Sequence, residues 1–280
     1  MKDFQGRVAA ITGAGSGIGR ALAINLAAAG CHLSLSDVNE SGLADTVAQL
    51  QQSGVKVTSA RVDVAQRAEV EAWAEQTAKD HGKVNLIFNN AGVALGGTVE
   101  GTSIEEYEWI VNINLWGVIY GTKAFLPHLV ASGEGHVINV SSIFGLFSQP
   151  TQSGYNATKF AVRGFTESLR QELDLAASGV SATCVHPGGI KTNIAAAAKF
   201  NDSAAALTGK NKEQSTKDFE KLFRTTADEA AKIILKAVRG NKRRVLVGFD
   251  AKVIDVFQRV LPTAYQRVVA GALRAQSKRA

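Results

Sequence analysis

The sequence contains few of the residues that mark disulfides, metal sites or linkers. Only two of its 280 residues are cysteines, Cys31 and Cys184, and each lies in an apolar run with strand character. We therefore expect buried, reduced thiols and no disulfide framework. The five histidines are scattered without ligand spacing, so no metal site is expected. With only four prolines, no linker separates two folding units, and one domain is the simplest assignment.

Long hydrophobic runs are also missing. No apolar stretch comes near the roughly 18 residues that a membrane span requires. The N-terminus reaches a strand-like run within a few residues, which leaves no room for the regions of a signal peptide. We therefore expect a soluble, cytoplasmic protein. A hydrophobic content of 45% with 20% charged residues is typical of a globular chain, here long enough to bury one continuous core.

Excess positive charge is confined to the end of the chain. Residues 239–280 contain ten Lys and Arg against Asp250 and Asp255, a local charge of +8, whereas the rest of the chain carries −2 and the whole chain +6. This segment has no basic platform interleaved with aromatics and no zinc-finger spacing. We therefore expect no nucleic-acid partner.

The sequence does show a regular alternation of strand-like and helix-like segments. Strand-like runs lie at residues 7–13, 31–37, 55–63, 84–92, 136–142, 180–188 and 243–249, and helical patterns at 18–29, 41–52, 69–79, 104–129, 153–177 and 227–239. Continuous apolar strands are buried on both faces, and strand–helix alternation implies right-handed crossovers. The sequence therefore predicts an α/β fold, a single Rossmann-type, doubly wound parallel sheet of about seven strands with helices on both faces.

Two segments depart from this alternation. Residues 190–225 are small, polar and rich in lysine and follow a strand end, where a lid over a ligand is expected. Residues 250–280 carry apolar residues at helical spacing among basic ones, and Pro262 begins a new helix or kinks one. We therefore assign residues 1–249 to the Rossmann-type domain, with the lid in it, and residues 250–280 to a basic amphipathic extension.

The segment TGAGSGIG, Thr12 to Gly19, lies between the first strand and the first helix. Glycines in such a turn let the backbone approach a pyrophosphate closely, and the helix N-terminus offers it free N–H groups and a partial positive charge. The alternative is a plain tight turn, but the position after the first strand favours dinucleotide binding. The cofactor residues predicted in this loop are Gly13, Ser16, Gly17, Ile18 and Gly19.

Two aspartates at the ends of the next strands are candidates for the adenosine half of a dinucleotide. Asp37 lies about twenty residues past Gly19, where a carboxylate accepts both ribose hydroxyls and repels a 2′-phosphate. NAD is therefore favoured over NADP, also because the loop offers no Arg or Lys for that phosphate. Asp63 is suited to hold the adenine edge together with the Val64 amide. For both aspartates the alternative is a helix cap.

Tyr155 and Lys159 share one face of the helix predicted at residues 153–177. Such a pair adds a few tenths of a kcal/mol to an exposed helix. The chemical alternative is a tyrosine whose pKa, normally about 10, is lowered by the adjacent positive charge so that it transfers a proton near neutral pH. The spacing alone leaves both interpretations open.

Six motifs, in order and spacing, resemble the short-chain dehydrogenase/reductase family. They are TGAGSGIG at residues 12–19, NNAG at 89–92, NINLWG at 112–117, VSS at 140–142, YNATK at 155–159 and HPGGIKT at 186–192. The resemblance runs from Lys2 to about Phe249. It implies an oxidoreductase that transfers hydride between NAD or NADP and a secondary alcohol or carbonyl compound.

The resemblance implies four catalytic residues. Tyr155 is the general acid and base, Lys159 stabilises its phenolate and holds the nicotinamide ribose, and Ser142 offers its hydroxyl to the substrate oxygen. Ser141 is the alternative serine, but its spacing to Tyr155 is one residue longer. Asn114 is implied to bind, at a local helix distortion, a water that links Lys159 to solvent; an interior helix Asn otherwise bonds solvent or backbone.

Further cofactor and substrate residues follow from the same resemblance. The cofactor residues are Asn90, Ala91 and Gly92, then Pro187, Gly188 and Ile190 beside the nicotinamide, and Thr192 on its carboxamide. The substrate pocket is expected to be formed by Ser142 and Tyr155 with mostly apolar residues on loops at strand ends, namely Val93, Leu95, Phe144, Leu146, Phe147 and Gln149. Such a pocket predicts a lipophilic alcohol or ketone.

The expected partners are less closely tied to motifs. Three alternatives are open for the apolar stripe of residues 250–280. It packs on its own domain, or it covers a partner subunit, or it lies on an anionic membrane, and the membrane alternative ranks last. The resemblance implies a homodimer or homotetramer formed through the helices at residues 104–129 and 153–177. The rival function is a non-catalytic nucleotide-binding protein or membrane-associated scaffold on the same fold, and the presence of all four catalytic side chains favours the enzyme.

Overall fold

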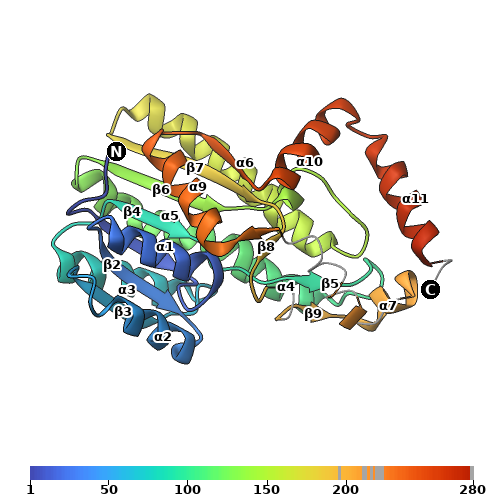
Figure 1. Ribbon diagram of the computed structural model, residues 1–280, viewed down its shortest axis with the longest axis horizontal. Helices are drawn as coiled ribbons and strands as arrows, with labels where there is room; N and C mark the ends of the chain where they lie inside the picture. The colour runs from blue at the N-terminus through green and yellow to red at the C-terminus, as the bar shows by residue number, and fades with distance from the viewer. Residues whose placement is uncertain (195–196, 210–212, 215–216, 218–223, 278–280) are drawn as a thin grey trace.

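A computed structural model of the chain describes residues 1–194, 197–209, 213–214, 217 and 224–277. Its centre is a seven-stranded, wholly parallel sheet in the order β11-β7-β6-β4-β1-β2-β3, with helices on both faces (Figure 1). The strands are β1 (Val8–Thr12), β2 (His32–Asp37), β3 (Val57–Arg61), β4 (Leu86–Asn89), β6 (Gly135–Val140), β7 (Val180–Pro187) and β11 (Arg244–Val247). The predicted doubly wound sheet is confirmed.

Two groups of helices cover the two faces of the sheet. One face carries α1 (Gly17–Ala28), α2 (Glu40–Leu50) and α9 (Ala227–Arg239), and the other α3 (Arg67–His81), α5 (Gly117–Ala131) and α6 (Ser153–Ala176). Successive side chains of a strand point to opposite faces, so Ile11 of β1 belongs to the first core and Ala10 to the second. Both cores are apolar, which explains why the central strands read as continuous hydrophobic runs.

Local sequence sets the ends of several helices. Thr226 and Glu229 form a capping box at the start of α9, in which each side chain accepts a hydrogen bond from the other residue's backbone N–H. Acidic residues occupy the first turn of α9 and basic residues the last, as the helix dipole favours. α3 ends at Gly82, whose φ of 73° is the left-handed conformation that glycine adopts most easily.

The strand order reverses between β1 and β4. β1 continues through β2 to β3 on one side, whereas β4 continues through β6 and β7 to β11 on the other. In open parallel sheets the crevice outside the carboxyl ends of the strands at such a reversal is where ligands bind. The glycine loop follows β1 and the NNAG motif begins at the end of β4, so both lie at this crevice.

The long helix predicted at residues 104–129 is interrupted. It consists of α4 (Ile104–Val111), a π-helical turn (Asn112–Trp116) and α5. A π turn inserts one residue into the helical repeat and is found mostly at functional sites. Hydrophobic periodicity does not encode this insertion and predicted one continuous helix, whereas the family resemblance implied a local helix distortion at Asn114, where the π turn lies.

Two short parallel ladders lie outside the main sheet, at the edges of the predicted lid. β5 (Leu95–Gly96) pairs with β9 (Lys199–Phe200), just before α7 (Asp202–Thr208), and β8 (Ile190–Lys191) pairs with β10 (Thr225–Thr226). The lid is described only in part, because residues 195–196, 210–212, 215–216 and 218–223 fall outside the described residues.

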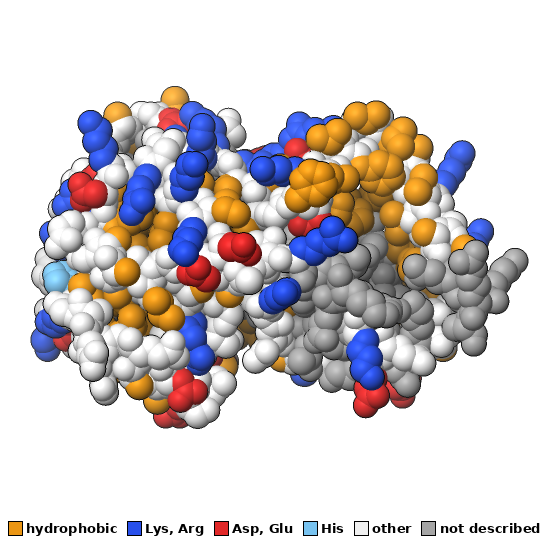
Figure 2. All heavy atoms as spheres, viewed as in Figure 1, with side chains coloured by type: hydrophobic (Ala, Val, Ile, Leu, Met, Phe, Trp, Pro, Cys, Tyr) orange, Lys and Arg blue, Asp and Glu red, His pale blue; other side chains and the backbone are white. Residues whose placement is uncertain are grey.

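The C-terminal extension forms two helices, α10 (Phe249–Val260) and α11 (Tyr265–Ser277). Their inner face packs on the domain: Ala251 and Tyr265 are buried in a cluster with Phe144, Phe147 and Tyr155. On their outer face, apolar side chains gather over both helices with Lys and Arg around them (Figure 2). The outer stripe of α10 consists of Phe249, Val253, Val256 and Val260, of which Phe249 is 80% and Val260 70% exposed.

Other bulk properties concern the thiols and the membrane. Cys31 and Cys184 are unpaired and buried, and burial raises the pKa of each thiol to about 12. Across the part of the chain that the structure describes, no helix has the length and apolar character needed to cross a membrane.

Candidate active site

The glycine loop is held closely against the NNAG segment. Gly13 has a φ of 67°, and a Cβ there would lie 2.9 Å from the Cα of Ala91. A Cβ on Gly19 would collide with the Gly13 carbonyl oxygen. Only glycine fits at these two positions. Because no side chain covers the loop backbone there, a ligand can approach it closely.

Hydrogen bonds tie the end of β4 to the same loop. Asn90 Nδ2 donates to the Thr12 carbonyl oxygen at 2.9 Å and to that of Gly13 at 3.2 Å. The Thr12 hydroxyl accepts from the backbone N–H groups of Asn90 and Ala91, each at 3.0 Å. These bonds place Asn90, Ala91 and Gly92 beside the loop, as the sequence predicts for cofactor residues.

Asp37 is held at the far side of the glycine loop. Its carboxylate accepts from the backbone N–H of Gly15 at 2.8 Å and from that of Asn39 at 2.9 Å. It does not cap α2, because the residue that does so is Asn39, whose side chain accepts from Gly42 N. The capping alternative for Asp37 is therefore wrong, and the carboxylate belongs to the loop.

A cation that the sequence reading overlooked lies next to Asp37. Arg20, in the first turn of α1, donates to the carbonyl oxygens of Gly15 and Gly42 and to the Thr46 hydroxyl. All three bonds go to acceptors of the chain itself. Arg20 thus ties the glycine loop to α2.

Asp63 and Val64 lie just past the end of β3. The Asp63 carboxylate accepts from Ala65 N at 3.0 Å in a local turn, and Gln66, not Asp63, stands at the N-cap of α3. The side chain of Val64 is buried, and a Cβ on Gly117 would lie 2.9 Å from its Cγ2. This close approach joins the end of β3 to the start of α5.

Ser142 and Tyr155 meet at the end of β6. The Tyr155 hydroxyl is hydrogen-bonded to the Ser142 side chain, and both residues are buried. Ser141 points elsewhere, since its hydroxyl donates to the Lys159 carbonyl oxygen at 2.8 Å. Of the two adjacent serines, Ser142 is thus the one whose hydroxyl accompanies the tyrosine.

Lys159 completes this group from one helical turn further along α6. Its Nζ lies 5.6 Å from the centre of the Tyr155 ring and donates to the Val140 carbonyl oxygen at 3.1 Å. A Cβ on Gly92 would lie 3.3 Å from the same Nζ and 3.2 Å from Asn114 Oδ1. Gly92 therefore leaves room for the ammonium and the amide to approach the NNAG segment.

Burial shifts the pKa values of this pair in opposite directions. It raises the pKa of Tyr155, which the hydrogen bond from Ser142 opposes, and it lowers the pKa of Lys159 to about 8. A pKa of Tyr155 lowered by the adjacent charge was one of the two interpretations of the spacing. The structure gives the opposite direction, because removal of the phenolate from water outweighs the effect of Ser142.

Asn114 sits in the π-helical turn and is fully buried. Its Oδ1 accepts from Val93 N at 2.8 Å and its Nδ2 donates to the Val93 carbonyl oxygen at 2.9 Å. The amide thus holds the backbone that follows NNAG, a contact that the sequence did not reveal. Its predicted water link to Lys159 stays a prediction.

The loop after β7 brings the predicted nicotinamide residues to the glycine loop. Ile190 is buried, and a Cβ on Gly17, whose φ is 51°, would lie 3.0 Å from Thr192 Cγ2. Pro187 and Gly188 lead into this loop from the end of β7. Thr192 and the start of α1 therefore face each other across the crevice.

His186 is a second residue that sequence reasoning missed. It is fully buried and pairs its Nδ1 with the Ser142 carbonyl oxygen at 2.8 Å. A carbonyl only accepts, so Nδ1 carries the proton, and burial lowers the pKa of His186 to about 4. The imidazole is neutral at physiological pH, and its bond to the Ser142 carbonyl oxygen holds the Ser142 backbone in place. The HPGG motif pointed only to the residues after it.

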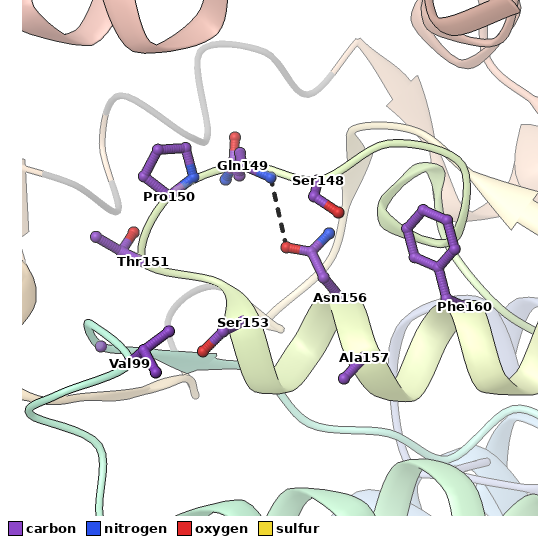
Figure 3. Close-up of a pocket in the computed structure, with 10 residues that line it drawn as sticks. Val99, Ser148, Gln149, Pro150, Thr151, Ser153, Asn156, Ala157 and Phe160 are labelled. Atoms are coloured by element: carbon purple, nitrogen blue, oxygen red, sulfur yellow. Dashed lines mark hydrogen bonds between the residues drawn. The ribbon is translucent and has the colours of Figure 1, made fainter. Parts of the chain in front are cut away.

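The predicted substrate residues fall into two groups. Val93, Leu95, Phe144 and Phe147 share one apolar cluster with Tyr155, and the Phe144 and Tyr155 rings meet edge to face at 5.9 Å. Leu146 is buried in the same loop. Gln149 instead lines a cavity of about 460 Å³ outside the start of α6, where its backbone N–H meets Asn156 (Figure 3). Neither Ser142 nor Tyr155 lines that cavity.

The crevice fits a dinucleotide. The N-cap of α1, Ser16, makes no side-chain capping bond to the described residues, so the N–H groups of the first turn face the loop side. The glycine positions leave the space that a Cβ would fill, and a carboxylate stands at the distal end. Such a helix start binds phosphate, and a carboxylate in this place binds ribose hydroxyls.

Known proteins share this arrangement. The family model for short chain dehydrogenase matches residues 7–202. SadH of Mycobacterium tuberculosis, whose name describes it as a candidate oxidoreductase, is 48% identical over 274 residues, which cover 98% of this chain and 97% of SadH.

Two solved structures are similar throughout. A short chain dehydrogenase/reductase from Burkholderia phymatum, in complex with NAD, has a TM-score of 0.87 at 32% identity and covers 95% of this chain and 97% of its own. Levodione reductase has a TM-score of 0.78 at 30% identity and covers 90% and 98%. Because the likeness to SadH spans 98% of the chain, it extends past residue 202 into the C-terminal helices.

Proposed function

Because the chain belongs to the short-chain dehydrogenase/reductase family of oxidoreductases, we propose that it interconverts a secondary alcohol and a ketone, with Tyr155 as general acid and base. The observation that carries the proposal is the burial of the Tyr155 and Ser142 side chains next to each other, with the Nζ of Lys159 5.6 Å from the centre of the Tyr155 ring. NAD, when bound, supplies or accepts the hydride. All other steps belong to side chains of the chain itself.

In the direction of ketone reduction, the Tyr155 hydroxyl donates its proton to the carbonyl oxygen as that oxygen gains negative charge. A raised pKa keeps Tyr155 protonated for this step. Ser142 donates a second hydrogen bond to the same oxygen, and it is preorganised because its carbonyl is held by His186. In alcohol oxidation the proton returns to Tyr155 from the hydroxyl.

Lys159 acts on Tyr155 through its charge. With a pKa of about 8 it is largely protonated at pH 7 and stabilises the phenolate that forms when Tyr155 gives up its proton. It is also within reach of the ribose of a dinucleotide that occupies the crevice, given its position beside Gly92. Asn114 holds the adjacent Val93 backbone in place.

NAD is the proposed cofactor, in preference to NADP. The Asp37 carboxylate at the glycine loop would repel a 2′-phosphate, and the bonds of Arg20 go to the carbonyl oxygens of Gly15 and Gly42 and to the Thr46 hydroxyl. The Burkholderia relative was solved with NAD, which is in line with this choice.

The proposed substrate is lipophilic. Leu95, Phe144 and Phe147 surround the tyrosine with apolar surface, and these buried side chains offer no charge to an ionic substrate. Levodione reductase, by its name a reductase, shares the fold. We propose in addition that the chain forms a homodimer or homotetramer through the helices at residues 104–129 and 153–177, where Trp116 and Phe160 are exposed.

The proposal is tested with Tyr155→Phe, which removes the hydroxyl and keeps the ring. Turnover of a ketone series with NADH should fall about 10³-fold, because the proton donor is lost. NADH binding, followed by fluorescence, should be unchanged. Tyr107→Phe is the matched control, since it also removes one tyrosine hydroxyl, whose partner is Ser153 at the start of α6, and should not affect turnover. Full activity of Tyr155→Phe would refute the proposal, and nucleotide binding without turnover in the wild type would favour the scaffold alternative.

A further inference from the structure

The C-terminal extension makes a polar contact with the loop that borders the nicotinamide site. Asp250, in the first turn of α10, accepts from the backbone N–H of Gly189 at 2.6 Å. A Cβ on Gly188 or Gly248 would collide with this carboxylate. The carboxylate therefore fits between glycines, and the loop after β7 has its conformation fixed by a residue outside the matched family segment of residues 7–202.

A second contact from the extension reaches the other side of the site. Tyr265, the first residue of α11, is buried, and its hydroxyl accepts from the backbone N–H of Ser148 at 3.0 Å. Its ring meets that of Phe147 edge to face at 6.0 Å. Tyr265 thus holds the loop that carries Phe144 and Phe147, the apolar residues around Tyr155.

The two contacts lie on consecutive helices that pack on the same apolar cluster. Ala251 is fully buried against the site cluster, and Ile254, Phe257 and Leu261 follow it at helical spacing on the same packed face. Figure 1 shows α11 running from the end of α10 towards α7. α11 and α7 are in contact. The extension therefore spans from the nicotinamide loop, past the substrate loop, to the lid.

Resting on the proposed function, we propose that α10 and α11 form a wall of the active site whose two positioning residues serve different ligands. Asp250 sets the nicotinamide loop at Gly188 and Gly189 and thereby the affinity for the dinucleotide. Tyr265 sets the loop at Phe147 and Ser148 and thereby the size of ketone that the site accepts. Neither side chain takes part in proton or hydride transfer.

Simple packing of a C-terminal helix would not require these contacts. The apolar face of α10 buries Ala251 without help from Asp250, and the Tyr265 ring packs on Phe147 without its hydroxyl. Each polar atom is instead directed at one backbone N–H of a ligand-bordering loop. Both bonds are partly buried, and loss of the acceptor removes a hydrogen bond that fixes the loop, so the loop backbone is freer to shift.

The test is a pair of variants in the full-length protein with opposite expected readouts. Asp250→Ala should weaken NADH binding about tenfold by fluorescence titration, with the relative kcat/KM across ketones of graded size unchanged. Tyr265→Phe should leave NADH binding unchanged and alter the relative kcat/KM of large over small ketones about fivefold. Asp255→Ala is the matched control, because Asp255 lies one turn further along α10 and pairs with Arg244 and Arg259.

Hydrogen exchange gives a readout that does not depend on turnover. The peptide spanning residues 187–190 should exchange faster in Asp250→Ala only, and the peptide spanning 147–150 faster in Tyr265→Phe only. Equal effects of both variants on both ligands, or no effect of either, would overturn the proposal. A wild type that binds NADH and turns over no ketone defeats the proposed function alone, since the NADH and exchange measurements still decide the role of Asp250.

Discussion

The crevice has a nucleotide end, at the glycine loop of residues 12–19, and a reaction end, at Ser142, Tyr155 and Lys159. The first is formed mainly by backbone and the second mainly by side chains. Around residues 12–19 the site is main chain, shaped by glycines at positions where any Cβ would collide. Around Ser142, Tyr155 and Lys159 it is side chains, polar groups removed from water at the cost of shifted pKa values. The nucleotide end is therefore stabilised by its tight packing. At the reaction end, burial of the polar groups lowers the free energy of unfolding.

Among the variants that test the difference between the two ends, Gly19→Ala is expected to have the largest effect. The added methyl meets the Gly13 carbonyl and Asn90 Nδ2, so we expect the free energy of unfolding to drop by about 3 kcal/mol. NADH binding should weaken with it, because the same backbone shift moves the loop. Urea denaturation and fluorescence titration measure the two changes.

Gly164→Ala provides the control for that variant. Gly164 lies exposed within α6 with no heavy atom near its hypothetical Cβ, so alanine should stabilise the protein by about 1 kcal/mol through helix propensity. If Gly19→Ala were as well tolerated as Gly164→Ala, the nucleotide end would not be a packed backbone structure.

The reaction end should respond in the opposite sense. A lysine pKa lowered from 10.5 to about 8 means that keeping Lys159 charged at pH 7 costs roughly 3 kcal/mol. Lys159→Met has a similar volume and loses the bond to the Val140 carbonyl, worth about 1 kcal/mol. We therefore expect it to raise the free energy of unfolding by about 2 kcal/mol while turnover is lost.

The pH dependence of the Lys159→Met effect has a defined sign. Between pH 8 and 10.5 the unfolded chain holds the Lys159 proton and the folded chain does not, so the stability of the wild type should rise with pH there relative to the variant. Lys79→Met, exposed on α3, should show neither the stabilisation nor this pH dependence. A destabilised Lys159→Met would show that the lysine is held by favourable contacts and would remove the contrast between the two ends.

The smallest effect concerns cofactor choice. Asp37→Ala removes the carboxylate that would oppose a 2′-phosphate, and the ratio of kcat/KM for NAD to that for NADP should fall about tenfold. Asp45→Ala takes one negative charge from the exposed side of α2, near Arg20, and should leave the ratio unchanged. Equal ratios in the two variants would mean that general charge, and not the position of Asp37, selects the cofactor.

The sequence was most informative where the hydrophobic period of a segment and the chemistry of its residues indicate the same element. The continuous apolar strands predicted the sheet, and the carboxyl ends of β1, β4, β6 and β7 placed the motifs at one crevice. The local bonding could not be predicted, because it depends on which face a residue occupies. The resemblance and the spacing indicated Ser142 as the partner of Tyr155, but the bond of the neighbouring Ser141 hydroxyl to the Lys159 carbonyl oxygen depends on the folded strand end and could not be predicted.

Contacts across long stretches of chain were hidden for a related reason. The stripe in residues 250–280 predicted amphipathic helices, and own-domain packing was one of three alternatives. Nothing in its period indicated that Asp250 would reach Gly189, 61 positions earlier, or that Tyr265 would reach Ser148, 117 positions earlier. A capping interpretation of Asp37 failed similarly, since the neighbouring Asn39 takes that place.

The two deeply buried thiols make the chain convenient for site-directed labelling. With both thiol pKa values at about 12, Cys31 and Cys184 hold almost no thiolate at neutral pH, and maleimide reagents react with thiolate. A single cysteine introduced on an exposed position of α11 would therefore carry a dye alone. The motion of that helix relative to the rest of the protein can then be followed in solution without first removing the native sulfur atoms.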